Sequence, residues 1–123
     1  MIAVQAAHAL EEYLREFWSA FPPMRAVYGG LPDQGKLVFV AFHATLLGFG
    51  GWCYFRWVRG GGEAAHRVIA LWTAIQSVTV LLHVAWFLTA PAYQPGLATL
   101  PLFLATIALA LVALKRSQDS STK

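Results

Sequence analysis

The chain has 123 residues, of which 58% are apolar and 12% are charged, and its formal net charge is +3. Charged residues make up about a quarter of an ordinary soluble domain, so this chain has too few to cover one. The composition also excludes a disordered chain, and the single cysteine excludes a disulfide-stapled secreted scaffold. These properties favour a membrane protein.

The N-terminal segment, residues 2–21, is predicted to form one amphipathic helix. Its apolar side chains recur at spacings of three and four, namely Leu10, Tyr13, Leu14, Phe17, Trp18 and Phe21. Glu11 and Arg15 form an acid-to-base pair four residues apart on the other face. Because the segment is charged, we expect it to lie in the membrane interface or to enter the membrane partly. Pro22 and Pro23 are predicted to end it.

Three later segments are long and apolar enough to cross a membrane, which requires about 20 residues for a hydrocarbon core of about 30 Å. They cover residues 37–58, 68–89 and 97–114. Each is predicted to be a helix, because lipid offers the backbone no hydrogen-bond partners. The predicted fold class is all-α: a single-domain integral membrane helical bundle with three transmembrane helices and the N-terminal helix.

The basic residues predict the orientation of the bundle. Arg59 and Arg67 flank the connection between the first two spans, and Lys115 and Arg116 follow the third span, whereas residues 90–96 carry no charge. Because short basic loops stay in the cytoplasm, we expect the N-terminus outside and the C-terminus inside. These membrane flanks account for the positive charge, so no nucleic-acid partner is expected.

Three polar residues stand on one turn of the N-terminal helix. His8, Glu11 and Glu12 occupy positions i, i+3 and i+4 and project from one side. Imidazole and carboxylate groups together can ligate a divalent metal or transfer a proton. The same spacing is typical of the wet face of an interfacial helix, so spacing alone leaves both interpretations open.

Two histidines, His43 and His83, lie inside predicted spans. An ionisable group in a span usually faces the bundle and has a partner there. At 1.5 Å per residue, both histidines are predicted about 9 Å below the outer boundary. Gln76 and Thr79 share the inward face of the second span with His83. Histidines at equal depth also suit bis-imidazole haem ligation, although no haem-attachment pattern accompanies them.

Three separated motifs occur in order along the chain: His8-Ala9-Leu10-Glu11-Glu12, the later histidine His83, and Tyr93-Gln94-Pro95-Gly96. Together they resemble the HXXEE-domain membrane proteins, a family of unknown function. His83 matches the family's second histidine best, because it precedes the Tyr93 motif by ten residues at the end of a span. His43 has no clear counterpart. The family has a longer apolar segment before its first motif, whereas residues 1–7 precede His8 here.

The predicted topology brings these residues to the outer side of the membrane. We expect a site there for a divalent metal. Its donor set of imidazole and carboxylate groups suits zinc, iron or manganese. Its expected ligands are His8, Glu11, Glu12 and His83, with His43 as an additional candidate, and its expected lining residues are Gln76, Thr79 and Tyr93. The alternative is a buried hydrogen-bond network that fixes helix packing.

The leading functional hypothesis is a small polytopic membrane protein with a shallow outer-side His/Glu site. It would depend on a metal and bind or act on a lipid-soluble substrate. The alternative is a non-catalytic accessory or assembly subunit of a larger membrane complex, and a haem- or pigment-ligating subunit is the third hypothesis. Because three spans bury little surface, we expect either a homo-oligomer or partner subunits within the lipid bilayer.

Overall fold

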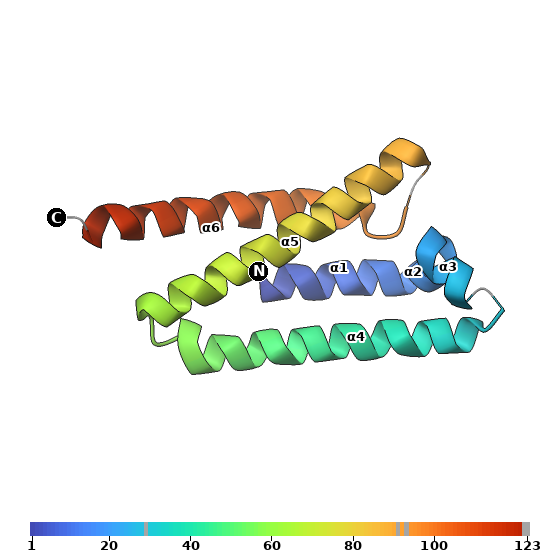
Figure 1. Cartoon of the computed structure of the whole chain (residues 1–123), viewed down its shortest axis with the longest axis horizontal. Coiled ribbons are helices and arrows are strands. Elements are labelled where there is room, and N and C mark those ends of the chain that lie inside the picture. Colours follow the sequence, from blue (N-terminus) through green and yellow to red (C-terminus); the bar gives the residue numbers. More distant parts are fainter. Residues whose placement is uncertain (29, 91, 93, 122–123) are drawn as a thin grey trace.

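The computed structural model describes residues 1–28, 30–90, 92 and 94–121. The chain forms an elongated bundle of helices (Figure 1), and no strand occurs among the residues described. The predicted all-α fold class is therefore confirmed.

Three long helices form the frame of the bundle. They are α4 (Pro32–Cys53), which continues as the π-helical turn η1 (Tyr54–Val58), α5 (Gly62–Thr89) and α6 (Leu100–Ser121), which follows the 3₁₀ turn η2 (Leu97–Thr99). Stretches long and apolar enough to span a membrane are Asp33–Val58, Gly62–Thr89 and Leu97–Ser117. The three predicted spans lie within these stretches and are confirmed as potential membrane helices.

The prediction of one continuous helix over residues 2–21 is wrong. The segment forms α1 (Ile2–Leu14) and α2 (Phe17–Ala20), and α3 (Pro22–Tyr28) follows. Glu16 has a φ of 53°, a left-handed conformation that a right-handed helix cannot continue through. Pro22 is the first residue of α3, a position where the missing N–H of proline is tolerated. The prolines therefore begin a new helix as well as separating it from α2.

The polar face of α1 points into the bundle. Its buried residues are Gln5, His8, Ala9 and Glu12, whereas Leu14 is 68% exposed. The interpretation of the His8 face as a wet surface is therefore wrong. An inward polar face and an outward apolar face suit a helix that is surrounded by lipid, because polar groups in that setting turn toward protein partners.

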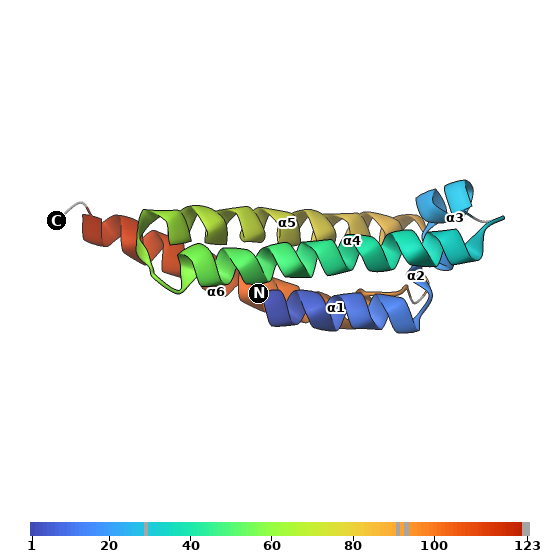
Figure 2. The same ribbon diagram turned by 90° about the horizontal axis from the view of Figure 1, so that it is seen from below.

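The helices pack around α1. Helix α1 contacts both α4 and α6, and α5 packs along α6. Figure 2 shows α4 and α5 on one side of the molecule, with α1 and α6 on the other. Helices α4 and α5 approach closely at one point, where a Cβ added to Gly50 would lie 2.5 Å from the Trp72 ring. Toward the other end of the bundle the two helices diverge (Figure 1), and the candidate site lies in that half.

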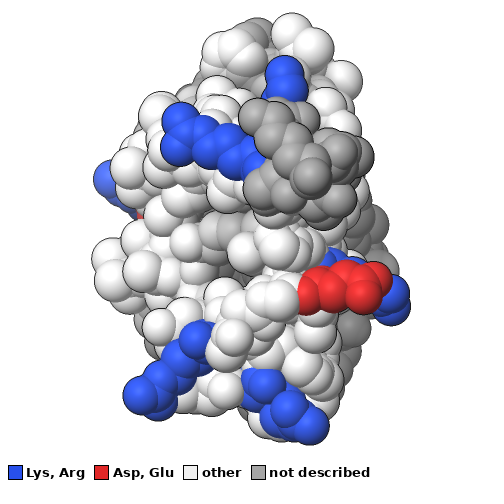
Figure 3. Space-filling view, turned by 90° about the vertical axis from the view of Figure 1, so that its left-hand side faces the viewer, with Lys and Arg blue, Asp and Glu red and all other residues white. Residues whose placement is uncertain are grey.

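Basic side chains gather at the end of the bundle that holds the connection between η1 and α5. Figure 3 views this end and shows several lysine or arginine side chains, with less acidic surface among them. Arg67 in this region pairs with Glu63 one helical turn away. The opposite end holds α2, α3 and the loop between α5 and α6, as Figure 1 shows.

Candidate metal centre

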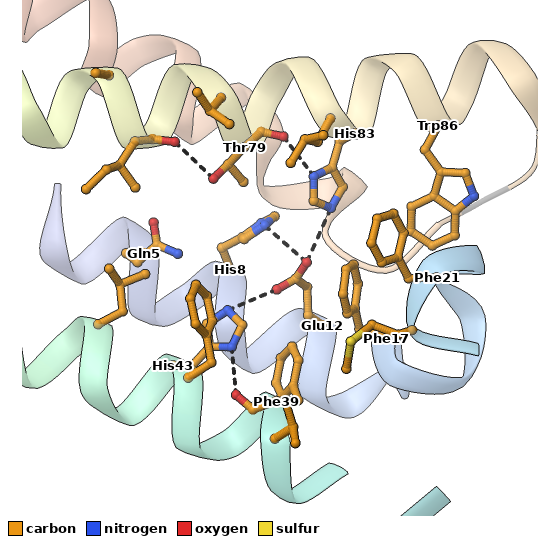
Figure 4. Close-up of a pocket in the computed structure, with 18 residues that line it drawn as sticks. Gln5, His8, Glu12, Phe17, Phe21, Phe39, His43, Thr79, His83 and Trp86 are labelled. Atoms are coloured by element: carbon orange, nitrogen blue, oxygen red, sulfur yellow. Dashed lines mark hydrogen bonds and ion pairs between the residues drawn. The ribbon is translucent and has the colours of Figure 1, made fainter. Parts of the chain in front are cut away.

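One buried carboxylate gathers three histidines from three helices. Glu12 of α1 has its Oε1 3.5 Å from Nε2 of His8 and 3.4 Å from Nε2 of His83 on α5. Its Oε2 lies 3.3 Å from Nε2 of His43 on α4. Figure 4 shows the three rings directed at this single group. The carboxylate therefore joins α1, α4 and α5.

The cluster is shielded from solvent. His8 is 1% exposed and Glu12 is 3% exposed, while His83 is also buried and His43 is partly exposed. Burial by itself raises the pKa of the Glu12 carboxyl, but contacts with His43, His8 and His83 outweigh it and hold that pKa well below its usual range. An ionised carboxylate that is buried in this way must be compensated by nearby positive charge.

The hydrogen bonds of two rings fix the position of their protons. Nδ1 of His43 lies 3.0 Å from the Phe39 carbonyl oxygen, and Nδ1 of His83 lies 3.0 Å from that of Thr79. A carbonyl oxygen can only accept, so each Nδ1 must donate. In the neutral form of either ring, Nε2 then carries a lone pair that faces Glu12.

The His8 ring has the same arrangement of protons, but its partner is a hydroxyl group in place of a backbone carbonyl. Nδ1 of His8 lies 2.7 Å from Oγ1 of Thr99. That hydroxyl donates its one proton toward acceptors, Oε2 of Glu11 at 2.8 Å and the Gly96 carbonyl at 3.0 Å. It must therefore accept from His8, whose Nδ1 donates and whose Nε2 is left with a lone pair. Nε2 of His8 is buried with no hydrogen-bond partner in the part of the chain described.

If all three rings are neutral, the centre of the cluster is a convergence of acceptors, because three Nε2 atoms face one carboxylate. Nε2 of His83 also lies 3.1 Å from the Pro95 carbonyl oxygen, and in that hydrogen bond the ring has to donate a second proton. Acceptors that face one another in a buried site repel unless a cation or protons lie between them. The arrangement therefore needs positive charge at its centre, supplied either by extra ring protons or by a metal ion.

Three of these residues have the spacing of metal ligands. One ligand atom from each of His8, Glu12 and His83 lies within 4.8 Å of the others. Two ligands about 2.1 Å from a tetrahedral ion would lie about 3.4 Å apart, which matches the 3.5 Å and 3.4 Å separations between Glu12 and the two rings. Two imidazoles and one carboxylate also leave coordination positions open for a substrate or water.

The structure separates the two adjacent glutamates. Glu12 points into the cluster, whereas the carboxylate of Glu11 accepts hydrogen bonds from the backbone N–H groups of Ala98 and Thr99 at 3.0 and 2.9 Å. Glu11 therefore lies outside the three-residue group with metal-ligand spacing, and its role as a ligand stays a prediction. Glu11 holds the η2 turn against α1 and places Thr99 beside His8.

Of the other predicted site residues, some contact the cluster or line the cavity beside it and others do not. His43 contacts the far oxygen of Glu12 and lies outside the three-residue group with metal-ligand spacing. Thr79 lines the cavity beside the cluster and accepts from His83 through its carbonyl. Gln76 does not line that cavity, because its amide donates to the Met1 carbonyl and accepts from Thr106. Tyr93 lies outside the described residues.

Two residues of the site were not predicted from the sequence. Thr99 orients His8 from 91 residues away, and nothing in the local sequence indicates that contact. Gln5 lies on the buried face of α1 and lines the cavity. Gln5 stands three residues before His8, so helical spacing alone would have placed both on the same face of α1.

A cavity of about 770 Å³ adjoins the cluster. Its polar residues are Gln5, His8 and Glu12 from α1, with His43, Thr79 and His83 from α4 and α5. Aliphatic and aromatic side chains of α4 and α5 form most of its remaining wall. Phe17 of α2, Met24 of α3 and Phe21 between these two helices complete it. Its volume is within the range of about 300–1,000 Å³ that is typical of small-molecule sites.

The arrangement does not suit haem ligation by His43 and His83. Their Nε2 atoms contact opposite oxygens of the same carboxylate, at 3.3 and 3.4 Å. The Glu12 side chain therefore occupies the position between the two imidazoles where a haem iron would have to lie.

No family model matches this chain, and neither a curated protein nor a solved structure matches it. The resemblance to HXXEE-domain proteins consequently depends on the three motifs alone. Function is therefore inferred from the geometry of the cluster and of the cavity.

Proposed function

We propose that this chain is a membrane protein that holds one divalent metal ion at His8, Glu12 and His83 and that binds or acts on a lipid-soluble substrate beside it. The observation that carries the proposal is the convergence of imidazole Nε2 atoms on one buried carboxylate. We further propose that the chain belongs with the HXXEE-domain proteins, whose first motif supplies His8 and Glu12.

The surroundings of the two rings support a metal in preference to extra protons. A histidine that ligates a metal usually donates its other ring N–H to a carbonyl, a carboxylate or another acceptor, which fixes its tautomer. His83 donates to the Thr79 carbonyl, and His8 donates to Thr99, which Glu11 in turn orients. Two imidazoles with one carboxylate suit zinc, iron or manganese.

The chemistry follows from the open positions of such a site. A divalent ion there would polarise a substrate oxygen or lower the pKa of a bound water. His43 lies against the other oxygen of Glu12, where it orients the carboxylate and can hold a proton beside the cavity. The apolar cavity wall would keep bulk water from the reacting atoms.

Elemental analysis of the purified protein tests the metal site. The protein is purified in detergent through a tag without histidines, and His8→Ala, Glu12→Ala and His83→Ala variants are compared with the original chain. We expect about one metal ion per molecule of the unsubstituted chain and almost none in the three variants, because removal of one of three ligands leaves too few donors. His66→Ala on α5 is the matched control, and it should retain the ion. Circular dichroism and elution volume confirm that each variant is folded.

The accessory-subunit hypothesis makes the opposite prediction. A metal-free original chain that purifies with other membrane subunits would overturn the metal proposal and support a structural role for the cluster. Ion content that persists in all three variants would place the ion elsewhere on the protein and would also overturn it.

We also propose that the end with α2 and α3 faces the outside and that the basic end seen in Figure 3 faces the cytoplasm. Cysteine labelling tests this in a chain with Cys53→Ala, which removes the native buried thiol. A membrane-impermeant maleimide added to intact cells should label Gln34→Cys and leave Glu63→Cys unlabelled until the membrane is permeabilised. Both positions are exposed. The reverse labelling pattern would invert the proposed topology.

A further inference from the structure

The cavity beside the cluster has the features of a binding site for one particular class of lipid. We infer that it binds a single-chain lipid with a terminal hydroxyl group, which enters sideways from the membrane between α4 and α5. The inference rests on the proposed function, since it names the substrate class of the same site.

The mouth of the cavity opens at the depth of the membrane. Three residues that line the cavity are also more than half exposed: Phe42 on α4 is 61% exposed, and Val78 and Leu82 on α5 are 56% and 55% exposed. All three lie within the potential membrane spans. The surface around the mouth would therefore contact lipid chains, so an apolar ligand could enter without crossing water.

Aromatic residues close the end of the cavity nearest to α2 and α3. The ring of Phe21 lies 5.1 Å from that of Trp86, and the ring of Phe17 lies 5.9 Å from Trp86, both in edge-on contact. Figure 4 shows these side chains gathered beside His83. This aromatic group separates the cluster from the membrane surface, which favours entry from the lipid side.

The polar wall of the cavity selects the head group of the lipid. Gln5 is 2% exposed, and its Oε1 is a buried acceptor without a hydrogen-bond partner within the described chain. A hydroxyl group can donate a hydrogen bond to this oxygen, whereas an ionised carboxylate can only accept and a hydrocarbon can do neither.

Photochemical labelling tests the inference. The full chain is placed in lipid nanodiscs with a hexadecanol that carries a diazirine in the middle of its chain, and labelled peptides are identified by mass spectrometry. We expect saturable labelling of the cavity walls on α4 and α5. Unlabelled hexadecanol should compete about tenfold better than palmitate or hexadecane, which corresponds to about 1.4 kcal/mol for one well-placed hydrogen bond.

Two valines on α5 provide a matched pair of variants. Val78 lines the cavity, whereas Val84 is 43% exposed and lies outside the cavity wall. Val78→Trp should fill the mouth and reduce saturable labelling at least about fivefold, while Val84→Trp should leave it unchanged. Leu46→Trp blocks the cavity from α4 and provides the same test if Val78→Trp does not fold. Gln5→Leu should abolish the preference for the alcohol over the hydrocarbon.

The outcomes separate this inference from the metal proposal, because metal content is measured on the same preparations. Labelling that does not saturate, spreads over α6 and is unaffected by Val78→Trp would overturn the lipid site even if the metal is present. Equal competition by palmitate and hexadecanol would overturn the hydroxyl preference. Saturable labelling of a metal-free chain would support the lipid site and contradict the metal proposal.

Discussion

Gly96 lies directly against His83. A Cβ added at Gly96 would lie 2.5 Å from Nε2 of His83 and 2.6 Å from Cε1 of His8. Gly96 also has a φ of 91°, in the region that only glycine adopts readily. The last residue of the Tyr93-Gln94-Pro95-Gly96 motif is therefore required by both backbone conformation and space, and it brings the loop before η2 against the two imidazole rings.

Gly96→Ala should displace His83 and remove the bound metal. The substitution adds backbone strain of about 1–2 kcal/mol and a steric clash with the ring. Metal content and the thermal unfolding midpoint measure the effect. Gly61→Ala is the matched control, because Gly61 has a φ of 71° but a Cβ added there would have no heavy atom within 4 Å. It should lower the midpoint slightly and retain the metal. Equal behaviour of the two variants would refute the role of the Gly96–His83 contact.

Glu12→Gln and Glu11→Gln should have different effects although the residues are adjacent. Glu12→Gln removes the charge that faces three rings, so we expect loss of the metal. Glu11→Gln weakens the hydrogen bonds to the Ala98 and Thr99 backbone and should cost about 1 kcal/mol of stability, like loss of a helix cap, with the metal retained. Elemental analysis and thermal unfolding distinguish the two. If Glu11→Gln lost the metal and Glu12→Gln retained it, Glu11 would be the ligand in place of Glu12.

His43→Ala should retain the metal at about one ion per chain. His43 contacts Oε2 of Glu12, the oxygen directed away from His8 and His83, and its removal leaves all three proposed ligands in place. Titration with zinc in the presence of a competing chelator should show a modest loss of affinity, because the carboxylate is less well oriented. A fall in stoichiometry like that of His83→Ala would make His43 a ligand.

Thr99→Val should lower metal affinity about 10–100-fold, which is the usual effect of removing a group that orients a metal-bound histidine. Valine keeps the shape of threonine but cannot accept the hydrogen bond from Nδ1 of His8. The same chelator titration measures the affinity. Thr89→Val is the control, since within the described residues the Thr89 hydroxyl bonds to carbonyls of its own helix, and its loss should not affect binding. Unchanged affinity in Thr99→Val would show that His8 is oriented by other contacts.

The amino-acid sequence by itself determined that this chain has three segments long and apolar enough to span a membrane, and where they lie. Hydropathy over about 20 residues is a local property, and the thickness of the membrane converts it directly into helix length. The inward direction of His83 also followed from sequence, because ionisable groups in a span turn toward the protein. Pro95-Gly96 is typical of a turn, because proline presets the backbone and glycine accepts a positive φ, and Gly96 has a φ of 91°.

Only the tertiary structure decided which residues form the site. Glu11 and Glu12 are neighbours on one helix, and the rotation of α1 against α4 and α6 determines which of them faces the rings. That rotation depends on packing between segments far apart in the chain, as the contact between His8 and Thr99 shows. The inward polar face of α1 has the same origin, because its buried polar side chains need hydrogen-bond partners from other parts of the chain.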